Sequence, residues 1–336
     1  MRALLVAALC GVGVLLAGQP QTRPWVIRNV RVFDGVMVRE HQSVVVRAGH
    51  VDSIGPAEAL AVPEDAEELA GENRTLLPGL IDAYVRVDPL RQVEALRQSV
   101  LLGVTTIVTP VIGEPPGPSA LVDAPISEQS DVLKIIYDGH GSNLPTLSES
   151  GITALVTAAH ARRRLAVAHI SSERQARGAV AAGVDGLVHL FVGPTVSADF
   201  GQLVASRNTF VIPTLSVLYR LCEHSCQGVR DAVRQLALAD AVVLAGTDAQ
   251  SPGTTHDASL HWELELLVEA GLTPTAALRA ATSAAADAFQ MPDRGRIAAG
   301  LRADLVLVNG DPTSRIGATR SIEAVWKRGV RVHRAP

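Results

Sequence analysis

The chain has 336 residues, which at about 150 residues per domain predicts two domains. It carries 34 acidic and 30 basic residues, a net charge of −4, and so lacks the basic surplus that binding to nucleic acid or an anionic membrane requires. Hydrophobic residues make up 47% of the chain, enough for a large aliphatic core and too many for a disordered protein. We therefore expect a globular protein that is stabilised by core packing and binds neither nucleic acid nor an anionic membrane.

The first residues differ in character from the rest. Arg2 precedes an apolar run over residues 3–17, and polar residues follow from Gln19. This run is short for a bilayer-spanning helix, and the order of charged, apolar and small residues is typical of a cleaved signal peptide. We therefore predict a signal peptide over residues 1–18 and export to the periplasm or outside the cell, with no membrane attachment after cleavage. An uncleaved anchor or a buried strand is the alternative.

Both ends of the mature chain have the pattern of β-strands. Val30 and Val32 alternate with polar neighbours before an Asp34-Gly35 turn, and residues 303–308 and 324–332 show further strands and turns. Neither block is large enough to bury a core of its own. We therefore predict one discontinuous β-sandwich domain built from residues 24–75 and 300–336.

Between these ends, apolar strand-like runs alternate with helical stretches over residues 76–299. Nearly continuous apolar strands joined by helices are typical of a parallel sheet covered on both faces. The number of such units predicts a (β/α)₈ barrel of the α/β class. A doubly wound sheet is the alternative, but the first strand lacks the glycine-rich phosphate loop of that fold.

Polar side chains stand where these predicted strands end. In a parallel barrel the carboxyl ends of the strands carry the functional residues. Two imidazoles suit zinc or a similar divalent metal, and a carboxylate completes such a site or acts as a base. Histidines satisfied within the core are the alternative interpretation. The strand-end residues are Tyr84, Arg86, Lys134, His169, His189, Thr214 and Asp248.

The ordered set of motifs around these residues resembles the amidohydrolase superfamily, in its imidazolonepropionase-like and Xaa-Pro dipeptidase-like branch. The similarity covers residues 25–336, and it is the order of the motifs rather than any one of them that is specific. The motifs are LPGLIDA at 77–83, VLKI at 132–135, AH at 168–169, GVDGLVH at 183–189, AGTDA at 245–249, HWELELLVEAGLTP at 261–274 and GLRADL at 300–305.

The resemblance implies a barrel with one or two divalent metals and a flanking β-sandwich made from both chain ends. In this family a metal-activated water attacks an amide, ester or lactam carbon. Carried over to this chain, the metal ligands are Lys134 in carbamylated form, His169, His189 and Asp248, with zinc as the expected metal. Asp248 is also the expected general base and acid. Relatives often form oligomers, so the resemblance also implies a homo-oligomer.

The sequence departs from the family at the first barrel strand, where the family has His-x-His and this chain has Tyr84-Val85-Arg86. Residues 84 and 86 share one face of a strand, but a phenol is a poor metal ligand and a guanidinium has no lone pair to give. We therefore expect the more buried metal to be missing and one ion to be held by Lys134, His169 and His189.

Arg86 has two interpretations. Its positive charge could replace the missing cation beside Asp248, which makes Arg86 a catalytic residue. Alternatively, Arg86 and Asp248 form an ion pair that stabilises an inactive homologue. The main prediction is a metal-dependent hydrolase of C–N bonds, and the alternative is a non-catalytic protein that binds a small molecule or a protein. An enzyme that uses Arg86 and Asp248 without metal is a third option.

A few further residues complete the predicted site. Tyr84, His140, Thr214 and His256 are predicted to contact the substrate, although a solvated loop histidine or a volume-filling tyrosine would look the same in sequence. Cys222 and Cys226 could form a disulfide or remain two thiols on one helix face. A metal site at these cysteines lacks further nearby ligands.

Overall fold

The computed structural model describes residues 23–86, 92–109, 111–112, 132–137, 147–193, 195–222, 226–256 and 258–332. The predicted signal peptide over residues 1–18 and His140 lie outside these ranges.

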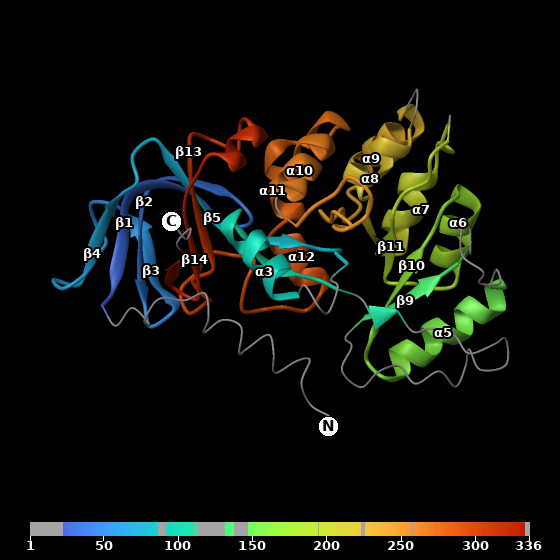
Figure 1. The fold of residues 1–336 in the computed structure, drawn as a ribbon, viewed down its shortest axis with the longest axis horizontal. Helices are drawn as coiled ribbons and strands as arrows, with labels where there is room; N and C mark the ends of the chain where they lie inside the picture. Colours follow the sequence, from blue (N-terminus) through green and yellow to red (C-terminus); the bar gives the residue numbers. More distant parts are fainter. Residues whose placement is uncertain are drawn as a thin grey trace.

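Both ends of the described chain contribute to one eight-stranded sheet, at the left of Figure 1. Its strands run in the order β15-β14-β13-β5-β1-β2-β3, and β4 pairs with β1. The C-terminal strand β13 pairs antiparallel with β5, which pairs in parallel with β1. A second layer of a sandwich remains a prediction. The strands are β1 (Trp25–Phe33), β2 (Val38–Arg47), β3 (His50–Pro56), β4 (Glu67–Ala70), β5 (Arg74–Pro78), β13 (Leu305–Asn309), β14 (Ile322–Lys327) and β15 (Val330–Val332).

Two tryptophans from opposite ends of the sequence join this sheet across its core. The rings of Trp25 and Trp326 stack with their centroids 4.7 Å apart. The indole Nε1 of Trp25 donates a hydrogen bond of 3.0 Å to the carbonyl oxygen of Gly329. Both rings are almost completely buried among valines, leucines and isoleucines from both chain ends. The eight-stranded sheet therefore has a hydrophobic core that neither end could form alone.

The central part of the chain contains parallel strands in two further sheets, one with the order β12-β11-β10-β9-β8 and the other made of β6 and β7. Single bridges, Val211 with Val243 and Val85 with Ala249, place residues 243–249 between β12 and the end of β6. These strands are β6 (Leu80–Asp82), β7 (Val104–Ile107), β8 (Val111–Ile112), β9 (Val132–Ile136), β10 (Leu165–His169), β11 (Gly186–Val188) and β12 (Phe210–Ile212).

The parallel strands form a TIM-barrel-like α/β arrangement, but no closed eightfold barrel is found in the described part of the chain. Residues 108–110 alone separate β7 from β8, whereas a crossover between neighbouring parallel strands needs about a dozen residues. β7 pairs with β6, and β8 pairs with β9. We therefore assign β7 and β8 together to a single strand position between β6 and β9. A closed eightfold barrel therefore remains a prediction.

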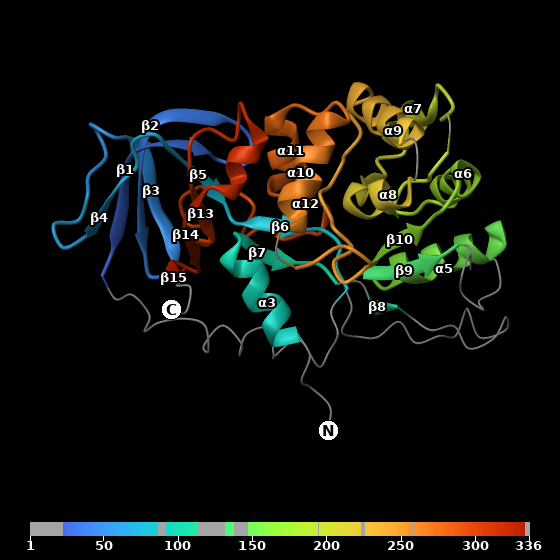
Figure 2. The ribbon, with the colours of Figure 1, turned by 45° about the horizontal axis from the view of Figure 1, so that its top comes forward.

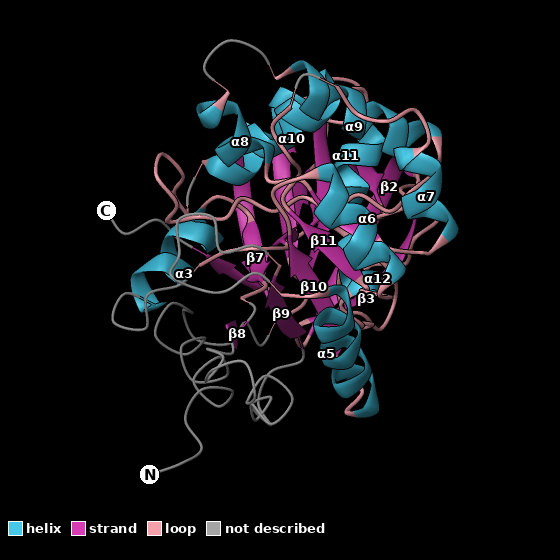
Figure 3. Ribbon diagram, turned by 90° about the vertical axis from the view of Figure 1, so that its right-hand side faces the viewer, coloured by secondary structure: helices cyan, strands magenta, loops and turns pink. Residues whose placement is uncertain are grey.

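Helices cover the outside of these strands, and α5, α6, α7 and α9 lie outside β9–β11 in Figure 3. Local sequence fixes several helix starts: Ser172 and Gln175 form a capping box for α6, and Thr273 caps α11 ahead of Pro274. None of the helices described is long and apolar enough to cross a bilayer. The helices are α3 (Gln92–Leu101), α5 (Glu149–Ala161), α6 (Glu173–Ala181), α7 (Phe200–Ser206), α8 (Leu215–Leu221), α9 (Gln227–Leu238), α10 (Ser259–Glu269), α11 (Pro274–Ala280), α12 (Ser283–Ala288) and a 3₁₀ helix at Ile316–Arg320.

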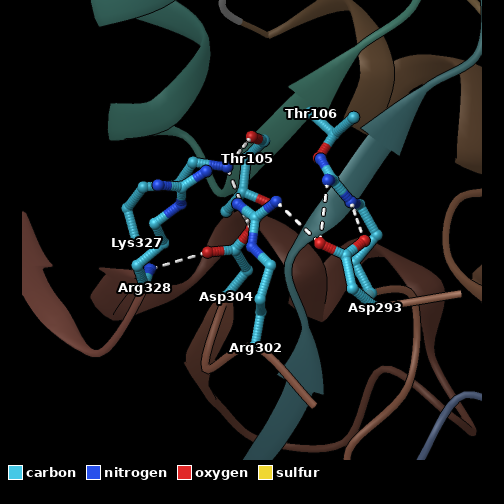
Figure 4. A network of polar contacts seen from close by, with 8 residues as sticks. Thr105, Thr106, Asp293, Arg302, Asp304, Lys327 and Arg328 are labelled. Carbon is cyan, nitrogen blue, oxygen red and sulfur yellow. Dashed lines mark hydrogen bonds and ion pairs between the residues drawn. The ribbon is translucent and has the colours of Figure 1, made fainter. Parts of the chain in front are cut away.

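The eight-stranded sheet meets β7 through charged side chains drawn in Figure 4, which we call the junction network: Asp293, Arg302, Asp304 and Lys327. Oδ2 of Asp304 accepts from Nη2 of Arg302 at 2.7 Å and from Nζ of Lys327 at 2.9 Å. Nζ of Lys327 also donates to the carbonyl oxygen of Thr105, in β7, at 2.5 Å. The network links the C-terminal strands to β7, and Figure 2 shows β13 and β14 beside β7 and α3.

Candidate functional site

The predicted strand-end residues come from neighbouring strands whose register brings them together. Lys134 of β9 is paired with Val167 of β10, and His169 lies two residues beyond Val167 on the same face. His189 directly follows β11, the next strand along the sheet. We call Tyr84, Arg86, Lys134, His169, His189 and Asp248 the strand-end cluster.

Four aromatic or basic side chains of this cluster are in contact. The imidazole rings of His169 and His189 lie edge to face, with centroids 4.5 Å apart. The ring of Tyr84 lies 5.6 Å from that of His189, also edge to face. Nζ of Lys134 donates a hydrogen bond to the hydroxyl of Tyr84. The structure therefore brings these four side chains side by side, while no group of three or more His, Cys, Asp or Glu suited to a metal is found within the described ranges.

His189 and Thr214 are in hydrogen-bond contact. Nδ1 of His189 lies 2.6 Å from Oγ1 of Thr214, and the same hydroxyl lies 2.8 Å from the carbonyl oxygen of Pro213. Which atom donates in the first contact depends on the tautomer of the imidazole. Nε2 of His189 is buried and has no hydrogen-bond partner in the part of the chain that the structure describes. Burial, followed by the nearby His169 and Lys134, lowers the pKa of His189 well below its usual value. The shift favours the neutral imidazole, and with its proton on Nδ1 the ring would present a lone pair at Nε2, as in a metal-binding histidine.

Lys134 is almost fully buried, with 6% of its surface exposed. Burial lowers its pKa to about 8; the positive charge of Arg86 acts in the same direction and Asp248 opposes it. Within the described ranges the amine has no ion-pair partner, and its hydrogen bond goes to the neutral Tyr84. A substantial fraction of Lys134 is therefore the neutral amine at mildly alkaline pH.

Arg86 and Asp248 form an ion pair with two contacts. Nε of Arg86 lies 2.8 Å from Oδ1 of Asp248, and Nη2 lies 3.3 Å from Oδ2. Oδ2 also accepts a hydrogen bond of 2.6 Å from the hydroxyl of Ser251. The side chain of Asp248 is 3% exposed and that of Arg86 is 53% exposed. The carboxylate is therefore buried and oriented, while part of the guanidinium faces solvent.

Asp82 connects the two strand positions that carry this ion pair. It accepts hydrogen bonds from Oγ1 and the amide of Thr247, at 2.6 and 3.0 Å, just before Asp248. Burial raises the pKa of Asp82 to about 7. The sequence analysis assigned no role to Asp82 or Thr247, although the LPGLIDA and AGTDA motifs contain them.

Three residues of the site have left-handed backbone conformations, each just beyond a strand. The φ angles of His189, Thr214 and Asp248 are 69°, 51° and 48°. Such angles are uncommon outside glycine and costly for the β-branched threonine, and strained residues of this kind concentrate at functional sites. The backbone strain therefore coincides with the predicted chemistry.

The other predicted contact residues occupy different positions. Thr214 is fully buried behind His189, so its hydroxyl serves the imidazole and does not line an open surface. Tyr84 and His256 are also buried, and their predicted substrate contacts remain predictions. Cys222 and Cys226 are free thiols, so the disulfide alternative does not describe this structure.

Comparison with known proteins identifies relatives for most of the described chain. The sequence pattern of the amidohydrolase family matches residues 130–332. The imidazolonepropionase of Streptomyces griseus subsp. griseus is 33% identical over 123 residues, which cover 35% of this chain and 31% of that protein. The chain spans about a third of the length of the imidazolonepropionases that it matches.

Solved structures share the fold across nearly the whole chain. A Xaa-Pro dipeptidase with bound methionine superposes with a TM-score of 0.78 at 18% identity, covering 92% of this chain and 99% of the other. The A. niger ochratoxinase superposes with a TM-score of 0.77 at 16% identity, covering 92% and 95%. At these identities the similarity establishes the fold alone.

Proposed function

Because the chain belongs to the amidohydrolase family, we propose that it hydrolyses C–N bonds of amides, peptides or lactams with one divalent metal ion, zinc being the expected ion. The observation that carries this proposal is the buried Nε2 lone pair of His189, which has no hydrogen-bond partner among the described residues and stands beside His169 and Lys134.

The residues present fit one ion and do not fit two. His169 and His189 supply imidazoles, and the neutral amine of Lys134 can add carbon dioxide to give an anionic carbamate oxygen as the third ligand. Asp248 is the fourth predicted ligand. A second ion would need ligands at residues 84 and 86, where a phenol and a guanidinium offer none of the required kind.

A divalent ion in this position would polarise the substrate carbonyl and lower the pKa of a water to about 7. The protein's own groups perform the remaining tasks. Asp248 accepts the proton of the attacking water and returns it to the leaving nitrogen. Arg86 orients Asp248 through two contacts and supplies positive charge where the second ion is missing. Tyr84 positions Lys134 through its hydroxyl.

A specific observation favours the alternative function, a non-catalytic homologue that binds a small molecule or a protein. The carboxylate of Asp248 already receives donors from Arg86 and Ser251, and Lys134 is bound to Tyr84. Polar groups that satisfy one another in this way also stabilise a barrel without chemistry.

Metal content and hydrolysis distinguish the two functions. We expect about one ion per chain after zinc supplementation, and turnover of at least one compound in a panel of N-acyl amino acids, Xaa-Pro dipeptides and lactams. Asp248→Asn should lower kcat by about 10²–10⁴-fold, the usual contribution of a general acid–base group. His189→Ala should lose the metal.

His160→Ala is the matched control for the histidine variant, because His160 is an exposed histidine on α5 and should change neither property. Binding of less than about a tenth of an ion per chain would exclude the single-metal enzyme. A ligand that binds equally well to Asp248→Asn and His189→Ala would support the non-catalytic protein.

The remaining expectations are proposals with simple tests. We propose that residues 1–18 direct export, which N-terminal sequencing of the protein from the periplasm and medium would reveal. We propose residues 24–75 with 300–336 as a β-sandwich domain and residues 76–299 as a (β/α)₈-type domain, which the sheet shared by both chain ends supports. Light scattering would measure the proposed homo-oligomer.

A further inference from the structure

A buried carboxylate lies behind the strand-end cluster and takes no part in the proposed chemistry. Glu263 of α10 is fully buried. Its two oxygens accept hydrogen bonds from the amides of Leu215 and Ser216, at 2.8 and 2.7 Å. These amides open α8, where the first turn of a helix has no intrahelical acceptors. Glu263 therefore fixes the backbone that immediately follows Thr214.

Thr214 transmits this constraint to His189. Its left-handed backbone, with φ 51° and ψ 49°, sets where its side chain points. The hydroxyl lies 2.8 Å from the carbonyl oxygen of Pro213, which can only accept; with its single proton given to that oxygen, the hydroxyl can only accept from the imidazole. A serine or threonine free to rotate could instead donate to Nδ1, which would move the ring proton to Nε2.

We propose that Thr214 and Glu263 are positioning residues that fix His189 in the tautomer with the proton on Nδ1. Glu263 holds the backbone in place, Thr214 accepts the Nδ1 proton, and Nε2 is left with its lone pair inside the strand-end cluster. Only the catalytic importance of this assignment rests on the proposed function, because the tautomer can be measured in the protein without metal. Hydrogen bonding at the second nitrogen is a general way to orient a metal-binding histidine.

The tautomer can be measured by NMR on the full chain without metal, labelled with ¹⁵N-histidine, with His189 assigned from its absence in His189→Gln. We expect a protonated Nδ1 and a non-protonated Nε2. Thr214→Val keeps the volume and removes the acceptor, and should move His189 largely to the Nε2-protonated form. Thr214→Ser keeps the hydroxyl and should retain the original tautomer.

Thr209→Val is the matched control. Thr209 is a buried threonine just before β12, whereas Thr214 lies just after it. The hydroxyl of Thr209 donates to the carbonyl oxygen of Val184, so its removal should leave the tautomer of His189 unchanged. Protonated Nε2 in the unmodified protein, or an unchanged tautomer in Thr214→Val, would overturn the proposal. Glu263→Gln should give a mixture of tautomers, and a pure Nδ1 form in that variant would remove Glu263 from the assignment.

Zinc titration separates this proposal from the proposed function. Thr214→Val should weaken zinc binding by about 10–100-fold, the usual effect of removing such a partner, while Thr209→Val should not. Unchanged zinc affinity in Thr214→Val would show that the tautomer does not support the metal. If no variant binds zinc but the tautomer depends on Thr214, the positioning role stands and the metal-dependent hydrolase fails.

Discussion

Asp248 in the strand-end cluster and Asp304 in the junction network are both 3% exposed, and each pairs with an arginine. The arginines differ, because Arg302 is 9% exposed and Arg86 is 53% exposed. Asp304 also accepts from Lys327, so its pair is part of a closed network (Figure 4). The carboxylate at the junction therefore has a buried arginine and a lysine as partners and links two parts of the fold, whereas the arginine at the strand ends is half exposed.

The same contrast extends to the groups nearby. The strand-end cluster contains a lysine bound only to a phenol hydroxyl among the described residues, and an imidazole nitrogen with an unused lone pair. Buried polar groups that only stabilise a fold are normally satisfied by partners. These two groups therefore distinguish the candidate functional cluster from the structural charge network at the junction.

The largest expected effect tests the structural side of this comparison. Asp304→Asn removes the carboxylate shared by Arg302, which is buried, and Lys327, which is partly exposed, and should lower the free energy of unfolding by about 3–5 kcal/mol. Urea denaturation measures the change. Asp293→Asn is the control: its carboxylate is 46% exposed and its loss should cost less than about 1 kcal/mol. A cost below about 1 kcal/mol for Asp304→Asn would contradict the structural role.

The next effect is a difference in pH response. Burial raises the pKa of Asp82 and of Glu263 to about 7, whereas the hydrogen bond from Arg294 is the main cause that lowers the pKa of Asp293 to about 2. Between about pH 4 and pH 7, Asp82 and Glu263 are protonated in the folded protein but deprotonated in the unfolded chain. Stability should therefore fall as the pH rises through this window.

Asp293 affects stability with the opposite sign, because the stability it contributes is lost as the pH falls from about 4 to 2. This contribution is small, since the carboxylate is partly exposed. Unfolding measured at a series of pH values separates the two windows. Glu263→Gln should reduce the fall between pH 4 and 7. An unchanged slope in that variant would show that Glu263 does not titrate as expected.

The smallest effect concerns Arg86. Arg86→Gln leaves Asp248 buried with Ser251 as a remaining donor, but water can enter the half-exposed position, so the expected cost is about 1–2 kcal/mol. Arg39→Gln is a suitable control, since Arg39 is equally exposed and pairs with the less buried Asp34; it should cost less than about 0.5 kcal/mol. A loss as large as that of Asp304→Asn would mean that both ion pairs are structural.

The sequence predicted the parts of the molecule that depend on local pattern. Strand-like runs at both chain ends predicted the shared sheet, and the polar residues after apolar strands predicted that His169 and His189 lie together. The pairing of Arg86 with Asp248 also follows from two residues on neighbouring strand ends. These inferences hold because periodicity and the common edge of parallel strands determine where side chains point.

Other features depend on geometry that the sequence does not show. The run over residues 104–112 has the composition of a strand, and its division between two partner strands emerges only in the structure. Thr214 was assigned to the substrate because nothing in a threonine indicates a left-handed backbone. Glu263 lies within an ordinary helical pattern, and its partners are distant in sequence, so its role could not be inferred.

The stacked Trp25 and Trp326 have a consequence for how the protein acquires its structure. Sheet contacts that join the two ends of the chain have high contact order, so they form slowly and late. During synthesis, β1 leaves the ribosome long before β13 and β14 have been made, so its apolar face stays exposed until they are. We therefore expect chaperone dependence during synthesis, and aggregation of chains that stop before residue 305, to centre on the N-terminal strands.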